Sequence, residues 1–141
     1  MATEVQSVKD VVRRYTEDGY NDANPAIIEE TVAEDVVVHG LPGADGPVRG
    51  VDAYLEWAGE LLKAIPDAHA EIEALLAEEN MAAVHWTMSG TQEGELGDLP
   101  PTGEPFSMRA LALFRFEDGQ IAEKWYVADE VSMLEQLGLT D

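Results

Sequence analysis

Cysteine is absent from this sequence, and its absence removes several kinds of chemistry. Without thiols the chain has no disulfide, no thiolate nucleophile and no zinc site built on sulfur. A glycine-rich phosphate loop after a strand and a serine elbow are also missing, which argues against nucleotide cofactors and acyl-enzyme chemistry. The histidines His39, His69 and His85 are too dispersed for metal-ligand spacing on a helix. We therefore expect no metal and no cofactor.

Basic residues are scarce. Eight Lys and Arg stand against 29 Asp and Glu, which gives a formal net charge of −21. Such a field repels phosphate backbones, so we expect no nucleic-acid partner. The acids are scattered among apolar positions and not concentrated in a tail, which indicates a folded, hydrated acidic surface. Because counterions screen the repulsion between carboxylates, we hypothesise a salt-rich, halophilic cytosol. An ordinary acidic protein is the alternative, and it would have to account for a chain with only three lysines.

Long apolar runs and a basic, apolar leader are lacking as well. We therefore expect no membrane span and a cytoplasmic location. A length of 141 residues suits a single domain, residues 1–141, with one core.

The first half of the chain has mainly helical spacing of its apolar residues. The expected elements are a helix over 5–19, a second helix over 25–32 opened by a proline, a buried strand at 36–38, a Gly/Pro-rich loop over 40–50 and a helix over 54–65.

The second half changes to the period of a strand. Residues 81–91 alternate, with Trp86 and Met88 on one face and His85 and Thr87 on the other. Two further runs, 106–116 and 121–127, are joined by Asp-Gly, the strongest short-range indication of a hairpin. A short helix over 130–137 follows. Helices first and antiparallel strands later predict an α+β fold.

Several short motifs in the second half carry a family resemblance. They are Pro66-Asp67-Ala68-His69, Gly90-Thr91, Pro100-Pro101-Thr102-Gly103, the Asp-Gly turn, Asp129 and Gln136-Leu137-Gly138. In this order they resemble the SnoaL-like polyketide cyclases of the NTF2-like superfamily. The resemblance implies a cone, in which a curved, mostly antiparallel sheet wraps around the three helices of the N-terminal half. It also implies an additional strand over 68–76, a short C-terminal helix, an internal pocket for a small apolar molecule, and a homodimer.

The resemblance implies where the site lies, but this sequence lacks the acid that characterised cyclases have there. The acid/base aspartate of characterised cyclases matches Tyr126 here, and its Gln and His companions match Ala110 and Ala112. Tyr126 is a poor base at its ordinary pKa, but it could donate a hydrogen bond to a carbonyl oxygen or simply line the pocket. Asp129 is a candidate base, although an Asp directly before a helix is a preferred N-cap, and we favour the cap.

His85 is the candidate proton shuttle, because histidine titrates near neutrality. Its alternative is a strand histidine bonded to a neighbouring strand. The candidate catalytic residues are thus His85, Tyr126 and Asp129. The residues expected to contact substrate are Tyr15, Val38, His39, Trp86, Thr87, Met108, Arg109, Ala110, Ala112 and Trp125.

Two functions remain open at this point. The first is a cofactor-free enzyme that uses His85 and Tyr126 for an aldol-type cyclisation, isomerisation or hydration of a small apolar carbonyl compound. The second is a non-catalytic ligand-binding or scaffold protein that has kept the pocket and lost the acid.

Overall fold

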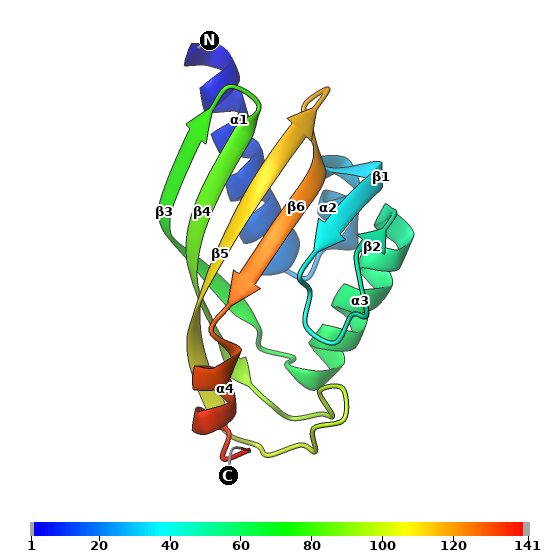
Figure 1. Cartoon of the computed structure of the whole chain (residues 1–141), viewed down its shortest axis with the longest axis vertical. Helices are drawn as coiled ribbons and strands as arrows, with labels where there is room; N and C mark the ends of the chain where they lie inside the picture. Colours follow the sequence, from blue (N-terminus) through cyan, green and yellow to red (C-terminus); the bar gives the residue numbers. More distant parts are fainter. Residues whose placement is uncertain (1, 140–141) are drawn as a thin grey trace.

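The computed structural model describes residues 2–139 and shows a curved six-stranded sheet with helices against one face (Figure 1). The elements follow in the order α1 (Ala2–Arg14), the π-helix η1 (Tyr15–Tyr20), α2 (Pro25–Thr31), β1 (Val32–His39), β2 (Val48–Arg49), α3 (Val51–Ala64), β3 (His69–Glu78), β4 (Met81–Thr91), β5 (Pro105–Glu117), β6 (Gln120–Ala128) and α4 (Glu130–Gln136).

The strands lie in the order β2-β1-β6-β5-β4-β3, and all neighbours are antiparallel except the pair β1 and β6. The predicted α+β fold and its curved, mostly antiparallel sheet are confirmed. The strand expected over 68–76 is present as β3. Two details differ from expectation: the loop over 40–50 contains the short strand β2, and the first helix ends in the wider turns of η1.

The hairpin between β5 and β6 turns at the predicted Asp-Gly pair. Asp118 and Gly119 both have positive φ, 51° and 79°, as a type I′ turn requires. Glu117 pairs with Gln120 across this turn. One pair further on the register shifts by a residue, because Phe116 pairs with Ile121 but Arg115 pairs with Glu123. After this bulge the residues of β6 alternate again, with Lys124 on the buried face.

The core lies between the inner face of the sheet and the helices. On β5, Ala112, Phe114 and Phe116 are at most 6% exposed, whereas Leu111 and Leu113, which alternate with them, are 57% and 41% exposed. Successive residues of a strand point to opposite faces, so this alternation separates a buried inner face from an open outer face. Helices α1, α2 and α3 cover the inner face (Figure 1).

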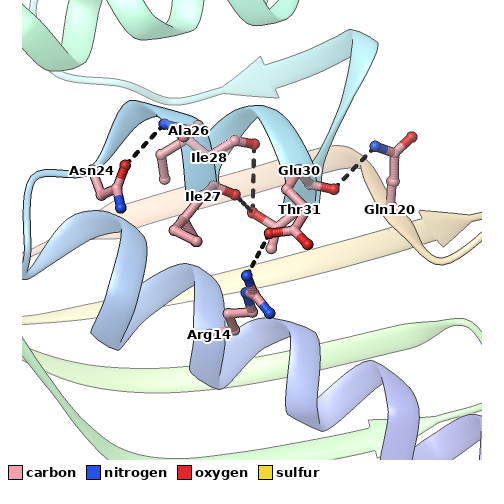
Figure 2. A network of polar contacts seen from close by, with 8 residues as sticks. All are labelled: Arg14, Asn24, Ala26, Ile27, Ile28, Glu30, Thr31 and Gln120. Carbon is pink, nitrogen blue, oxygen red and sulfur yellow. Dashed lines mark hydrogen bonds and ion pairs between the residues drawn. The ribbon is translucent and has the colours of Figure 1, made fainter.

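Polar contacts fasten α2 between α1 and the hairpin (Figure 2). Arg14 of α1 donates to the Glu30 carboxylate at 2.5 Å, and the Gln120 amide donates to the Glu30 carbonyl oxygen at 3.1 Å. Asn24 caps α2 by accepting from the Ala26 backbone N–H at 3.1 Å. These contacts hold the segment that follows η1 against the sheet.

The π-helix η1 continues α1 and is followed by Asn21, which contacts the edge of the sheet. The Asn21 N–H donates to the Thr16 carbonyl at 2.9 Å, an i to i+5 bond that makes the turn wider than an α-helical one. The Asn21 side chain then pairs with both backbone groups of Ala70 on the edge strand β3, at 2.9 and 2.7 Å. One amide thus fixes the helical layer to this end of the sheet.

The motifs that carried the family resemblance stabilise loops. The buried Gln92 holds the loop after β4 by donating to the Pro100 carbonyl at 2.9 Å and accepting from the Thr102 hydroxyl at 2.8 Å. Asp67 accepts from the backbone N–H and the hydroxyl of Thr91, at 2.7 and 2.9 Å. Both contacts hold segments that directly follow a regular element, Asp67 after α3 and Gln92 after β4.

None of the helices within residues 2–139 is long and apolar enough to cross a membrane.

Candidate active site

A cavity of about 290 Å³ lies between the inner face of the sheet, η1 and α3. Its walls are mainly apolar and come from several elements, with Leu41, Leu55, Trp57, Trp86, Met88 and Phe106 among them. A concave, apolar space with a few polar groups is the usual form of a small-molecule site.

The ionisable side chains that line the cavity are few. They are Tyr15, Tyr20, Tyr54, Tyr126, Lys124 and Glu130. Among the residues that the structure describes, no histidine, aspartate or arginine belongs to the lining. Glu130 is exposed, which places its carboxylate where the cavity reaches the surface.

Lys124 is the buried cation of this cavity. It lies on β6, is 6% exposed, and donates hydrogen bonds to the Tyr15 and Tyr54 hydroxyls at 3.1 and 3.3 Å. The two hydroxyls are also hydrogen-bonded to each other. Tyr15 begins η1 and Tyr54 lies in α3, so the cluster joins three elements that are far apart in the sequence.

Aromatic rings surround the Lys124 ammonium. Its Nζ lies 5.0 to 5.7 Å from the ring centroids of Tyr15, Tyr54, Trp86, Phe114 and Tyr126. Each such contact stabilises a cation by about 0.5–2 kcal/mol, with the larger values where water is excluded.

No carboxylate of a described residue pairs with Lys124. By contrast, Arg14, Lys63 and Arg115 each pair with a glutamate. Burying a charge without a partner costs several kcal/mol, which two neutral hydroxyls and the rings offset only in part. The fold therefore maintains an unpaired cation beside an apolar cavity.

Three phenols of the cavity, those of Tyr15, Tyr20 and Tyr126, stay protonated. Burial, together with the nearby Tyr54, raises the pKa of Tyr15 well above its ordinary value. Burial likewise raises the pKa of Tyr20 and of Tyr126. These side chains are therefore neutral near pH 7, and none of them supplies the missing negative charge.

The structure brings some of the predicted site residues together and separates others. Tyr126, Tyr15, Trp86 and Met108 line the cavity. Three more, Val38, Ala110 and Ala112, are buried in the core without lining it.

Five further predicted residues are neither in the lining nor in the buried core. They are His39, His85, Thr87, Arg109 and Trp125. On β4 and β5 the reason is the strand period: His85 and Thr87 flank the inward Trp86, and Arg109 lies between Met108 and Ala110. His85 is registered with Leu111, which places both on the outer face.

His39 belongs to a separate polar group. Its Nε2 lies 2.7 Å from a Glu123 carboxylate oxygen, and its ring stacks on Trp125 with centroids 5.4 Å apart. Arg115 donates to the other Glu123 oxygen at 3.3 Å. Hydrogen bonds from His39 and then from Arg115 lower the pKa of Glu123. Glu123 lies on the opposite face of β6 from Lys124, and it does not line the cavity.

Asp129 caps a helix. Its Oδ1 accepts from the backbone N–H of Ser132 at 3.1 Å at the first turn of α4, and it is not among the residues that line the cavity. The favoured interpretation of this residue as an N-cap matches the observed geometry.

Sequence reasoning missed Lys124. The alternation on β6 contained the necessary information, because Lys124 lies two residues before Tyr126 and shares its face. Trp125 and Tyr126 point to opposite faces of the sheet, so the prediction that both residues lie in the pocket combined two faces in one site.

Among the side chains that the structure describes, no three of histidine, aspartate or glutamate come together as metal ligands.

A curved sheet that encloses an apolar cavity against three helices defines an NTF2-like pocket protein. The chain belongs to the SnoaL-like polyketide cyclase family, whose model matches residues 9–137. No curated protein matches this sequence.

Solved structures agree with this assignment. IdmH of Streptomyces antibioticus, described as a candidate polyketide cyclase, is 29% identical over 93% of this chain and 98% of its own, with a TM-score of 0.81. AclR of Streptomyces galilaeus, a candidate hydroxylase, is 26% identical over 97% and 88%, with a TM-score of 0.83. A candidate SnoaL-like cyclase from Jannaschia sp. CCS1 reaches a TM-score of 0.87 at 19% identity, over 98% and 96%, and supports the fold.

Proposed function

We propose that the protein is a cofactor-free enzyme that binds a small apolar carbonyl compound in the cavity and moves protons on it. The reaction class is aldol-type cyclisation, isomerisation or hydration. The observation that carries the proposal is the Lys124 ammonium, buried in an apolar cavity and oriented by the hydroxyls of Tyr15 and Tyr54. Preorganised donors of this kind stabilise the oxyanion that develops when a proton leaves the carbon next to a carbonyl.

The same geometry suggests a role for each side chain. The carbonyl oxygen accepts a hydrogen bond from Lys124, and Tyr126 donates a second one from the same strand face. Glu130 is the carboxylate of the cavity lining, and it takes the carbon-bound proton and returns it. The charge on the enolate oxygen is then opposite to a fixed positive charge.

Exchange of carbon-bound hydrogen tests the proposal without knowledge of the natural substrate. The bicyclic ketone β-tetralone is incubated with the protein in deuterium oxide, and loss of its α-proton signal is followed by NMR. We expect exchange faster than in buffer, loss of the acceleration in Lys124→Met, and little change in Lys63→Met, which removes an exposed lysine (side chain 77% exposed).

His85→Gln tests the catalytic role that the sequence predicts for His85. Because His85 is absent from the cavity lining, we expect this variant to retain exchange. If His85→Gln abolishes exchange while Lys124→Met retains it, the proposed site is wrong.

A second function, ligand binding without turnover, is favoured by one observation. The buried part of the lining holds no carboxylate and no histidine among the described residues, so a strong base is missing from the interior. Binding of β-tetralone without any accelerated exchange would support this alternative.

We also propose that two copies associate through the outer face of the sheet. Leu76, Ala83, Leu113 and Trp125 are registered in one row across four strands, and Ala74, His85, Leu111 and Val127 in the next. Leu76, Leu111 and Val127 are 69%, 57% and 68% exposed. Neither row contains an acidic residue, so a second copy can approach there with little of the repulsion expected elsewhere on so acidic a chain.

A further inference from the structure

We propose that the ligand of the cavity carries an anionic oxygen at one end of an apolar body, and that this oxygen is the missing counter-charge of Lys124. This inference deepens the proposed function by naming the class of ligand, and it rests on that function only in assigning the ligand to the same cavity.

The first argument is the hydrogen-bonding capacity of Lys124. An ammonium has three N–H donors, and two of them are used by the Tyr15 and Tyr54 hydroxyls. No acceptor among the described residues takes the third, although every buried polar side-chain atom has at least one partner. Because Lys124 lines the cavity, the remaining donor is available to a ligand oxygen.

The second argument is charge. In a chain with 29 acidic residues, this lysine has none of them in an ion pair within the described part. The hydroxyl groups that it contacts belong to phenols, which cannot balance its charge while they are protonated. A ligand that brings one negative oxygen satisfies both the charge and the third donor.

The third argument is the rest of the lining. Leu55, Trp86, Met88 and Phe106 offer aliphatic and aromatic surface, and Glu130 at the exposed end repels a second negative charge. A compound with one carboxylate, acidic enol or phenol on a fused-ring or similarly apolar body fits this distribution. Polyanions such as nucleotides do not.

Binding of a matched pair of probes tests the inference. Naphthoate and naphthamide have nearly the same shape and differ in charge, and their affinities are compared by calorimetry in potassium chloride that screens the distant surface carboxylates. We expect wild-type protein to prefer naphthoate by about tenfold or more, as a charge-assisted hydrogen bond implies. Lys124→Met should lose this preference and Lys63→Met should keep it.

Para-nitrophenol distinguishes the two sources of the anionic oxygen. Its phenolate is coloured, so a visible titration reports whether the phenol bound to wild-type protein ionises at lower pH than free para-nitrophenol, and whether Lys124→Met loses this shift. A lowered midpoint supports an enol or phenol ligand. Naphthoate preference without a lowered midpoint supports a carboxylate ligand. Both results support an anionic oxygen on Lys124.

The inference is overturned if wild-type protein binds naphthamide as tightly as naphthoate and does not lower the midpoint of para-nitrophenol. This comparison uses wild-type protein alone, so it remains decisive if Lys124→Met fails to fold. The proposed function can fail while the inference holds. Naphthoate preference without exchange of β-tetralone would identify a binding protein for apolar anions. Exchange of β-tetralone without naphthoate preference and without a lowered midpoint would contradict the inference and leave an enzyme for neutral ketones.

Discussion

Glu123 and Lys124 are adjacent in the chain and opposite in charge, yet they lie on opposite faces of β6 and do not pair. Glu123 bonds to His39 and Arg115, whereas Lys124 is buried among aromatic rings and bonds to tyrosine hydroxyls. The strand period separates the two side chains, because neighbouring residues of a strand point in opposite directions. Glu123 and Lys124 therefore do not form an ion pair with each other, and Lys124 remains an unpaired cation at the cavity.

Lys124→Met should leave the free energy of unfolding unchanged or raise it by about 1–4 kcal/mol, because it replaces an unpaired buried charge with an apolar side chain of similar volume. Chemical denaturation of the variant and of wild-type protein measures the difference. Lys63→Met is the control, for which we expect a change within about 0.5 kcal/mol. A loss of several kcal/mol in Lys124→Met would show that the cation holds the fold together.

Asp67→Asn should make stability less dependent on acid pH. Hydrogen bonds from the Thr91 backbone and hydroxyl lower the pKa of Asp67 below its ordinary value of 3.8. The ionised carboxylate therefore stabilises the folded state fully above that ordinary value, and the contribution disappears as the pH falls through the lowered folded pKa.

Unfolding free energies of wild-type protein and Asp67→Asn, measured from neutral to acid pH, check this expectation. The difference should be largest at neutral pH and shrink in acid. A difference that stays constant over the whole range would contradict the ionic contribution of Asp67.

Leu111→Glu should convert a dimer into a monomer, because it places a carboxylate in the apolar rows of the outer face. Light scattering at high salt measures the mass. Ala53→Glu adds the same charge at an exposed position on α3 and should leave the mass unchanged. A wild-type mass of one chain would refute the proposed dimer.

Potassium chloride should raise the melting temperature. The net charge of −21 destabilises the compact state through self-repulsion, and counterions screen that repulsion. A thermal melt at increasing potassium chloride measures the effect, and a melting temperature that does not rise would contradict the adaptation to salt that the sequence suggested.

The sequence predicted elements whose determinants are local. The Asp-Gly turn, the proline at the start of α2 and the alternation of β4 each depend on neighbouring residues, and the structure confirms each of them. Strand β2 was missed because two residues leave no periodic pattern. The π-helix was missed because its wider turn is not visible in the spacing of apolar residues.

The candidate site depended on contacts between distant segments. Lys124 is separated by 109 residues from Tyr15 and by 70 from Tyr54, so its burial follows from the packing of η1 and α3 against β6. A lysine near a hairpin is ordinarily exposed to solvent, so nothing in the neighbouring residues marks Lys124 as buried. The alternation of β6 was sufficient to separate Trp125 from Tyr126, and it would have pointed to Lys124.

The wider turn of η1 absorbs one residue without changing the helical phase on either side of it. A π-helical turn holds one residue more than an α-helical turn, so deleting a single residue from this segment would let α1 continue as an ordinary helix while Asn21 still faces Ala70. Within Ala2–Arg14 no wide turn is present to absorb a deletion, so the residues before it would rotate by about 100° around the helix axis relative to those after it. The loss of one codon therefore has different consequences in two adjacent segments: at η1 it preserves the contact with the sheet edge, whereas in α1 it turns the buried face of the helix, with Val8 and Val12, away from the core.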